Sequence, residues 1–157
     1  MFQISVMKKK IGMFIMMLFS MALVSISSLD SNEGTGIVFK SMTINEAKEL
    51  ASSTGKLIFI DCYTDWCGPC KRMAATSFKD PDVALLYNKN FINVKVEMEK
   101  NPDGMGLARG YKVNAYPTLL FIDGEGNLFG KRVGMQNKDA LIIFANNVQQ
   151  KLVNTTK

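Results

Sequence analysis

Apolar residues in this chain gather in runs of two kinds. Short runs rich in β-branched and aromatic residues, bounded by Gly, Asn, Asp or Pro, are typical of strands. We predict strands over residues 37–39, 56–63, 91–98, 118–122 and 128–133. Segments in which apolar residues recur every three or four positions are typical of helices. We predict helices over residues 43–52, 67–76, 80–88, 105–109 and 138–152.

Cap and turn residues support the boundaries of these elements. Thr43 followed by Glu46 is a capping box that begins a helix, and Gly55 lies just past its end. The segment 123–127 consists of turn formers, which predicts a hairpin between the last two strands. The run at 56–63 is mostly apolar rather than alternating, so we expect a central strand that is buried on both faces.

The beginning of the chain predicts a secretory leader. Three lysines at 8–10 precede an apolar run over 11–24, and Ser25 and Ser27 occupy the small-residue positions of a cleavage site. The run is shorter than the ~20 residues that a membrane-spanning helix needs, although an uncleaved membrane anchor is the alternative. The predicted organisation is a signal peptide at 1–28, a flexible lead-in at 29–36 and one domain at 37–157.

The charge balance changes once this leader is set aside. The chain has 19 basic and 14 acidic residues, and three of the basic residues are the leader lysines. The remaining basic residues are scattered, which argues against a nucleic-acid-binding surface. The length that remains suits one domain with a single core. We expect this domain to act as a monomer.

The strongest chemical signal is Cys67-Gly68-Pro69-Cys70, close behind the predicted central strand. Two cysteines at this spacing can close a disulfide, and a helix N-terminus stabilises the first sulfur as a thiolate. Cys67 is therefore expected to be the more acidic, attacking thiol. We expect Cys70, one turn along and less exposed, to resolve the mixed disulfide. A structural zinc site needs about four ligands, which one such pair and no histidine do not supply.

Two further residues in the predicted central strand are unusual. Burying Asp61 without a partner costs several kcal/mol or raises its pKa, so its position needs a reason. A proton acceptor beneath the dithiol is one reason; the alternative is that Asp61 ends the strand and faces water. Cys62 has the parity of Ile58 and Ile60, so we expect it to be a buried small hydrophobe, although an odd cysteine also allows intermolecular pairing or regulation.

Together these residues resemble the thioredoxin family, with four landmarks in order between Phe59 and Gly134. The resemblance implies an α/β thioredoxin fold, with a central mixed β-sheet flanked by helices on both faces. The catalytic roles it implies are nucleophile for Cys67, resolving thiol for Cys70, buried proton acceptor for Asp61 and tuning of that acid for Lys95. The substrate-binding residues it implies are Trp66, Gly68, Pro69, Tyr116, Pro117 and Gly134.

Several of these assignments have plainer alternatives. Pro117 faces the dithiol only if its peptide bond is cis, and a trans proline in an ordinary turn is the alternative. Trp66 is expected to shield the dithiol, but a tryptophan after a strand is often part of the core. Lys95 is expected beside the buried acid, but it could be a solvated lysine on an edge face. Tyr116 and Cys62 also depart from the family, which more often has smaller and larger apolar residues, respectively, at these positions.

The residues between the cysteines bear on the direction of electron flow. The Gly-Pro pair resembles reducing thioredoxins, whereas oxidants and isomerases of this fold more often carry a histidine there, and this chain has none. With the leader, this predicts a periplasmic reductase of client-protein disulfides. A membrane thiol carrier would supply its electrons, and the Cys67–Cys70 disulfide would be its only redox group. The alternatives are an extracytoplasmic oxidase or isomerase, or a redox-inactive binding module.

Overall fold

The structure is a computed structural model that describes residues 36–155. Within this range the strands form one mixed sheet in the order β2-β1-β3-β4. β1 pairs in parallel with β2 and antiparallel with β3, which pairs antiparallel with β4. The strands are β1 (Leu57–Tyr63), β2 (Phe91–Glu97), β3 (Thr118–Ile122) and β4 (Leu128–Val133). The predicted leader at 1–28 and the lead-in up to residue 35 lie outside the described residues.

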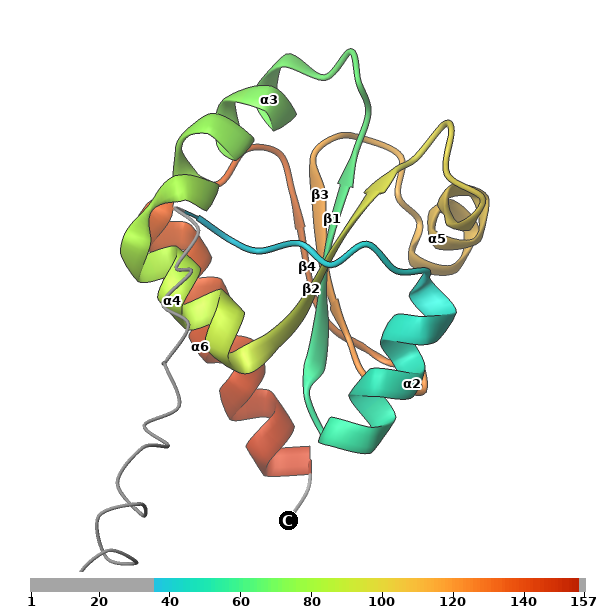
Figure 1. Cartoon of the computed structure of the whole chain (residues 1–157), viewed down its shortest axis with the longest axis vertical. Coiled ribbons are helices and arrows are strands. Elements are labelled where there is room, and N and C mark those ends of the chain that lie inside the picture. Colours follow the sequence, from blue (N-terminus) through green and yellow to red (C-terminus); the bar gives the residue numbers. More distant parts are fainter. Residues whose placement is uncertain (1–35, 156–157) are drawn as a thin grey trace, which may run out of the picture. The chain divides into compact units, whose positions relative to one another are not determined.

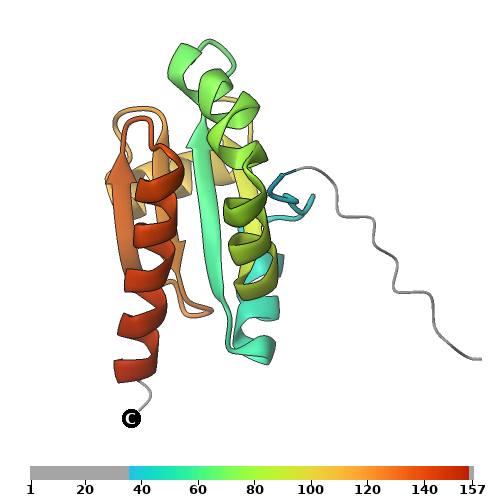
Figure 2. The same ribbon diagram turned by 90° about the vertical axis from the view of Figure 1, so that its left-hand side faces the viewer.

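Helices cover both faces of this sheet, as predicted. α2 and α5 lie on one face, and α3, α4 and α6 lie on the other (Figure 1). A quarter turn shows α4 and α6 side by side over that second face (Figure 2). The helices are α2 (Ile44–Thr54), α3 (Gly68–Ala75), α4 (Pro81–Asn90), α5 (Asp103–Tyr111) and α6 (Lys138–Thr155), with a short 3₁₀ turn η1 (Ser77–Lys79) between α3 and α4.

β1 is buried on both faces and divides the core in two. Ile58, Ile60 and Cys62 face the cluster under α2 and α5, whereas Leu57 and Phe59 face the cluster under α3, α4 and α6. The predicted burial of the central strand is confirmed. Because side chains alternate along a strand, residue 61 must point toward α3, the helix that begins with the dithiol turn.

Cys62 is a free cysteine with no exposed surface. Burial raises the pKa of its thiol far above the usual range, and the nearby Asp61 adds to the shift. A thiol held in its neutral form among apolar side chains is unreactive. The expectation that Cys62 is a small buried hydrophobe is confirmed.

The capping box predicted for the first helix is present. The Thr43 hydroxyl accepts a hydrogen bond from the Glu46 N–H at 3.2 Å, and the Glu46 carboxylate accepts one from the Thr43 N–H at 2.7 Å. α2 ends at Thr54, and Gly55, whose φ of 69° is left-handed, caps it. The hairpin between β3 and β4 is also present.

The predicted strand over 37–39 is wrong. The N–H of Val38 donates to the side chain of Asn88 at 2.8 Å, and its carbonyl accepts from the side chain of Asn93 at 3.4 Å. Only at Lys40 does the segment donate a backbone hydrogen bond to β2, to the Asn93 carbonyl at 2.8 Å. Side-chain amides therefore take the places that a neighbouring strand would fill, and the segment runs beside β2 without joining the sheet.

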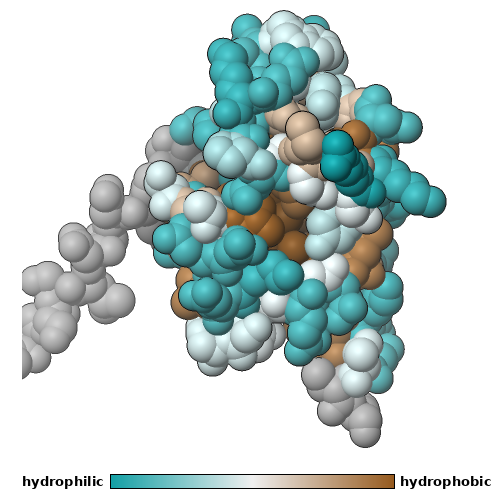
Figure 3. All heavy atoms as spheres, turned by 90° about the vertical axis from the view of Figure 1, so that its right-hand side faces the viewer, coloured by the Kyte–Doolittle hydropathy of each residue, from teal (hydrophilic) through white to brown (hydrophobic). Residues whose placement is uncertain are grey.

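The face formed by α2 and α5 has a shallow hollow with apolar residues at its bottom and hydrophilic residues around it (Figure 3). Partly buried Met42, Leu50 and Ala108 pack against the core cluster on this side.

Among residues 36–155, no helix is long and apolar enough to cross a membrane.

Candidate active site

The end of β1 leads directly into the dithiol turn. The N–H of Cys67 donates to the Thr64 carbonyl at 3.1 Å, and α3 begins at the next residue. Pro69 lies in the first turn of α3, where its missing N–H costs no helical hydrogen bond. Cys67 and Cys70 are joined in a disulfide. β1 is an inner strand, and the turn that leads from it into α3 lies at one end of the sheet (Figure 1).

Cys67 is the N-cap of α3. Its sulfur accepts a hydrogen bond from the Cys70 N–H at 3.1 Å. A backbone donor and the positive end of a helix dipole both favour negative charge on this atom. When the disulfide is open, the arrangement stabilises a thiolate at Cys67 rather than at Cys70.

Both cysteines are buried in this disulfide form, so the expectation that Cys70 is the less exposed one is not confirmed. Cys67 is 2% exposed and Cys70 is 5% exposed. The reason is a pocket of about 420 Å³ between α3 and the sheet, whose lining includes Cys70 but not Cys67. Cys70 is therefore reached from the side of the sheet.

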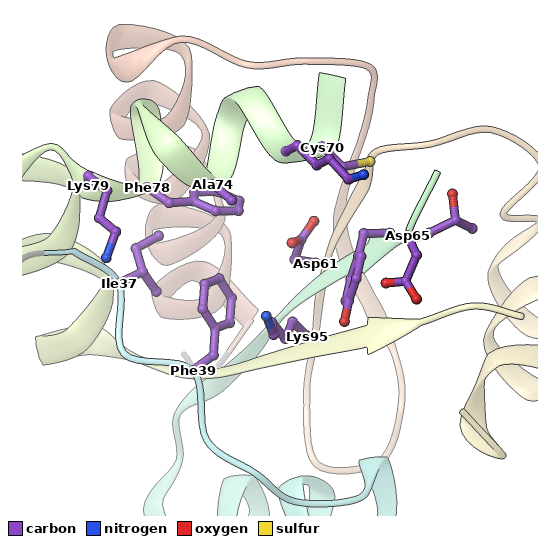
Figure 4. A pocket seen from close by; sticks show the side chains of 12 residues that line it. Ile37, Phe39, Asp61, Asp65, Cys70, Ala74, Phe78, Lys79 and Lys95 are labelled. Carbon is purple, nitrogen blue, oxygen red and sulfur yellow. The ribbon is translucent and has the colours of Figure 1, made fainter. Parts of the chain in front are cut away.

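Asp61 lies in this pocket, beneath Cys70 (Figure 4). The residue is 6% exposed, and its Oδ1 has no hydrogen-bond partner among the described residues. Burial raises the pKa of the carboxyl to about 7, although the positive charge of Lys95 opposes the shift. An acid with this pKa can take up and release a proton near neutral pH. The alternative that Asp61 faces water does not fit this burial.

Lys95 lies directly opposite Asp61 in the parallel pairing of β1 with β2. Its side chain is exposed, and its ammonium lies 5.2 Å from the centre of the Tyr63 ring. No hydrogen bond or ion pair within the described residues joins it to Asp61. Lys95 is thus a solvated lysine on the edge of the sheet, as one alternative held. Its positive charge still lowers the pKa of the buried Asp61, as the other expected.

The peptide bond between Tyr116 and Pro117 is cis. Pro117 is buried, directly before β3, and its carbonyl accepts a hydrogen bond from the Gly134 N–H at 2.8 Å. Gly134 has a φ of 87° and so adopts a conformation that residues with a Cβ avoid. This hydrogen bond fixes the end of the β3–β4 hairpin.

Aromatic rings flank the dithiol turn on the outside. Trp66 is 67% exposed, which excludes a place in the core, and its ring meets the Tyr116 ring at a centroid distance of 5.9 Å. Gly68 and Pro69 are also exposed. The turn therefore offers a flat, largely apolar surface next to the disulfide.

Sequence reasoning missed two acidic residues that hold this turn. Glu97 accepts hydrogen bonds from the backbone N–H groups of Asp65, Glu99 and Lys100 at 2.6 to 3.1 Å. The Glu99 carboxylate accepts from the indole N–H of Trp66 at 3.1 Å, and Asp65 forms an ion pair with Lys100. The signal was available, because Glu97 is the last residue of β2, which pairs with β1, and Glu99 lies two residues beyond it.

A family model described as thioredoxin-like matches residues 39–124, more than half of the chain. The chain belongs to the thioredoxin-like family. The recognised family and the predicted fold class are therefore confirmed.

The chain is similar to several thiol-disulfide proteins. It is 31% identical over 119 residues to the thiol:disulfide interchange protein DsbD of Haemophilus influenzae, covering 73% of this chain and 20% of that protein. It is 41% identical to a Bacteroides thetaiotaomicron protein described as a candidate disulphide-isomerase, with a TM-score of 0.64, covering 73% of this chain and 95% of that one. A thioredoxin from Thermus thermophilus, 24% identical with a TM-score of 0.66 and covering 76% and 93% of the two chains, shares the fold.

This chain thus spans about a fifth of the length of the DsbD relatives it matches. It is a thioredoxin-like domain that carries a Cys67–Cys70 disulfide, and it is similar to proteins named for thiol:disulfide interchange. Within residues 36–155, no cluster of three or more cysteine, aspartate or glutamate side chains is placed to hold a metal ion.

Proposed function

We propose that this chain reduces disulfides of client proteins outside the cytoplasm through the Cys67–Cys70 dithiol. The observation that carries the proposal is the disulfide at the start of α3, with Asp61 beneath it. The Gly-Pro pair between the cysteines supports the reducing direction, because this dipeptide resembles that of reducing thioredoxins. The similarity to the thiol:disulfide interchange protein DsbD supports a role in thiol exchange.

The first step is attack by the Cys67 thiolate on one sulfur of a client disulfide. A sulfur–sulfur bond forms between Cys67 and the client, the client's own bond breaks, and its second sulfur leaves as a thiolate that takes up a proton. The backbone donor to the Cys67 sulfur favours the thiolate that begins this step.

The second step closes the disulfide that the structure contains. Asp61 accepts the proton of the Cys70 thiol, and the resulting thiolate attacks the Cys67 sulfur. The mixed disulfide breaks, and the client sulfur that was bound to Cys67 leaves as a thiolate and takes up a proton. Two electrons have then passed from the dithiol to the client. A membrane thiol carrier would return them, so the reaction needs no other cofactor.

The remaining site residues would bind the client. An extended client segment would lie along the backbone at Tyr116 and cis Pro117, where the absence of an N–H on proline leaves room for the disulfide. Trp66, Gly68 and Pro69 would provide the exposed flank, and Gly134 would keep the opposite edge of the groove free of a side chain. Lys95 would adjust the protonation of Asp61.

The location follows from the predicted leader. Residues 1–28 would direct the chain across the inner membrane into the periplasm, either cleaved or as an anchor, and residues 37–157 would act there as a monomeric domain. Mass spectrometry of the protein from a periplasmic fraction tests this. Recovery only from the cytoplasm, with residues 1–28 intact, would contradict it.

The reduction potential of the dithiol tests the direction of electron flow. The full chain is equilibrated in glutathione and dithiothreitol buffers, and the oxidised fraction is measured by thiol alkylation. A reductase is expected near the thioredoxin value of about −270 mV. A Cys62→Ala variant is the control and should give the same value, because Cys62 is buried and free.

A second function has one specific observation in its favour. The Bacteroides thetaiotaomicron relative, at 41% identity, is described as a candidate disulphide-isomerase. A potential between about −120 and −180 mV would support an oxidase or isomerase and contradict the reductase. A chain that fails to reduce insulin at all would instead be a redox-inactive binding module.

A further inference from the structure

The pocket beneath Cys70 is separate from the expected client groove. It lies between α3 and η1 on one side and the ends of β1 and β2 on the other, and it is closed by residues 37–39 (Figure 4). Its volume of about 420 Å³ is within the range of small-molecule sites. Its lining contains neither Cys67 nor any of the residues assigned above to the groove, namely Trp66, Gly68, Pro69, Tyr116, Pro117 and Gly134.

One part of the pocket is apolar. Ile37 and Phe39 from the segment beside β2 line this part together with Ala74 of α3 and Phe78 of η1 (Figure 4). The rings of Phe39 and Phe78 are 5.5 Å apart at their centroids, which fixes this wall. Ala74 is exposed although it lines the pocket, so its small side chain leaves the entrance open. This part suits an apolar body such as an aromatic ring.

The inner part of the pocket carries two unpaired polar atoms. Oδ1 of Asp61 and Oγ1 of Thr64 have no hydrogen-bond partner among the described residues, and the two residues are 6% and 1% exposed. Both residues line the pocket. Buried polar atoms in native proteins are nearly always paired, so these two indicate a group that can hydrogen-bond from within the pocket.

The rim of the pocket is positively charged. Lys71, Lys79 and Lys95 all line it, and none has an ion-pair partner in the part of the chain that the structure describes. The acidic residues that line it oppose them only weakly. Asp65 is paired with Lys100, and the pKa of Asp61 is raised to about 7 by burial. The rim therefore favours a negatively charged group.

We propose that this pocket is a binding site for a small amphipathic anion. Its apolar body would lie against Phe39, Ala74 and Phe78, and its charged group would lie at the lysine rim. A polar atom of the body would reach Thr64 and Asp61. The site is distinct from the client groove, and its existence does not depend on the direction of the redox reaction.

The test uses 8-anilinonaphthalene-1-sulfonate, an aromatic anion whose fluorescence rises on burial. Titration of the full chain in its disulfide form is expected to show saturable binding at one site. N-phenyl-1-naphthylamine, which is the same body without the sulfonate, is expected to bind at least about fivefold more weakly if the lysine rim recognises charge. Equal affinity for the two probes would overturn the anion preference.

Two pairs of matched variants locate the site. Ala74→Phe fills the pocket and should weaken sulfonate binding at least about tenfold. Its control, Ala75→Phe, places the same side chain at the next exposed position of α3, outside the pocket lining, and should change affinity less than about twofold. Lys79→Glu should weaken binding about fivefold or more, whereas Lys89→Glu on α4 should not.

Circular dichroism of each variant establishes whether it is folded. If Ala74→Phe does not fold, the comparison of Lys79→Glu with Lys89→Glu provides the test. No saturable binding to the parent chain would overturn the proposal. Loss of affinity that is equal in the two alanine variants, or in the two lysine variants, would also overturn it, because the probe would then bind elsewhere. Failure of insulin reduction would bear only on the proposed redox function.

Discussion

At the scale of single residues, Asp61 combines a cost in stability with the proton-accepting role proposed for it. Its side chain is buried beside Cys70 with one oxygen unpaired, and its pKa is raised to about 7. A group whose protonated form is favoured by folding binds protons more strongly in the native state than in the unfolded state. The native protein must therefore lose stability as this group ionises.

Asp61→Asn should remove this dependence on pH. In the parent chain, the free energy of unfolding should fall as pH rises from about 4 to about 7, because the folded pKa lies above the unfolded one. The fall should total about 4 kcal/mol and should be much smaller in the variant. Urea denaturation of the oxidised proteins at pH 4 and pH 8 measures it.

Asp139→Asn is the matched control, since Asp139 is an exposed carboxylate in the first turn of α6. It should keep the pH dependence of the parent chain. If Asp61→Asn shows the same fall as the parent, the carboxyl of Asp61 is not the group that titrates.

Gly134→Ala should destabilise the protein by about 1 kcal/mol, because φ is 87° at this position. The cost comes from the backbone alone, since a Cβ there would meet no atom within 4 Å. Gly106→Ala is the control. A Cβ at Gly106 also meets nothing, but the residue is helical and should be neutral or stabilising. Thermal unfolding of both variants measures the change in stability. An equal loss in Gly134→Ala and Gly106→Ala would contradict the argument that the positive φ of Gly134 is the cause.

At the scale of elements, local rules predicted most of the structure. The four strands and the helices follow from periodicity and caps, since their boundaries depend on nearby residues such as Thr43 and Gly55. Residues 37–39 were assigned wrongly because their β-branched and aromatic composition is typical of a strand. What decides their state is the contact with Asn88 and Asn93, about 50 residues away along the chain.

The capping box of α2 should contribute measurably to stability. Thr43→Ala removes the acceptor for the Glu46 N–H and should cost about 1 kcal/mol. Ser53→Ala at the other end of the same helix is the control and should change stability by only a few tenths of a kcal/mol. Urea denaturation midpoints measure both, and an equal loss in the two variants would show that the cap is not the cause.

Parts of the candidate site were also beyond sequence reasoning. The greater exposure of Cys70 arises from a pocket whose walls include Phe39 and Phe78, and no local pattern predicts that assembly. The direction of the Lys95 side chain depends on the Tyr63 ring in the neighbouring strand. The identity and order of the site residues could be predicted from the sequence. The orientations of their side chains could not, because they depend on contacts that form only in the folded chain.

At the scale of the whole molecule, the disulfide separates two surfaces. The exposed aromatic flank of Trp66 and Tyr116 lies on the outside, and the pocket with Asp61 lies on the side of the sheet. The proposed mechanism assigns attack to Cys67 and release to Cys70. Removing one or the other thiol should therefore stop the reaction at different stages.

Cys70→Ala should accumulate a covalent complex with a disulfide-containing client such as insulin. The Cys67 thiolate can still form the mixed disulfide, but no second thiolate resolves it. Cys67→Ala should form little or no complex. Electrophoresis without reductant, followed by mass spectrometry, measures the adduct. Equal trapping by the two variants would contradict the assigned roles.

The burial of Cys62 has a consequence for how this chain acquires its disulfide. Any two of its three cysteines can pair in the unfolded chain, whereas the folded sheet encloses Cys62 and leaves Cys67 and Cys70 together. Oxidation before folding should therefore yield mispaired isomers, and folding before oxidation should yield one; peptide mapping distinguishes them. A Cys62→Ala chain should give one isomer by either route. The order of folding and oxidation, rather than the motif alone, thus determines how much active enzyme a cell obtains.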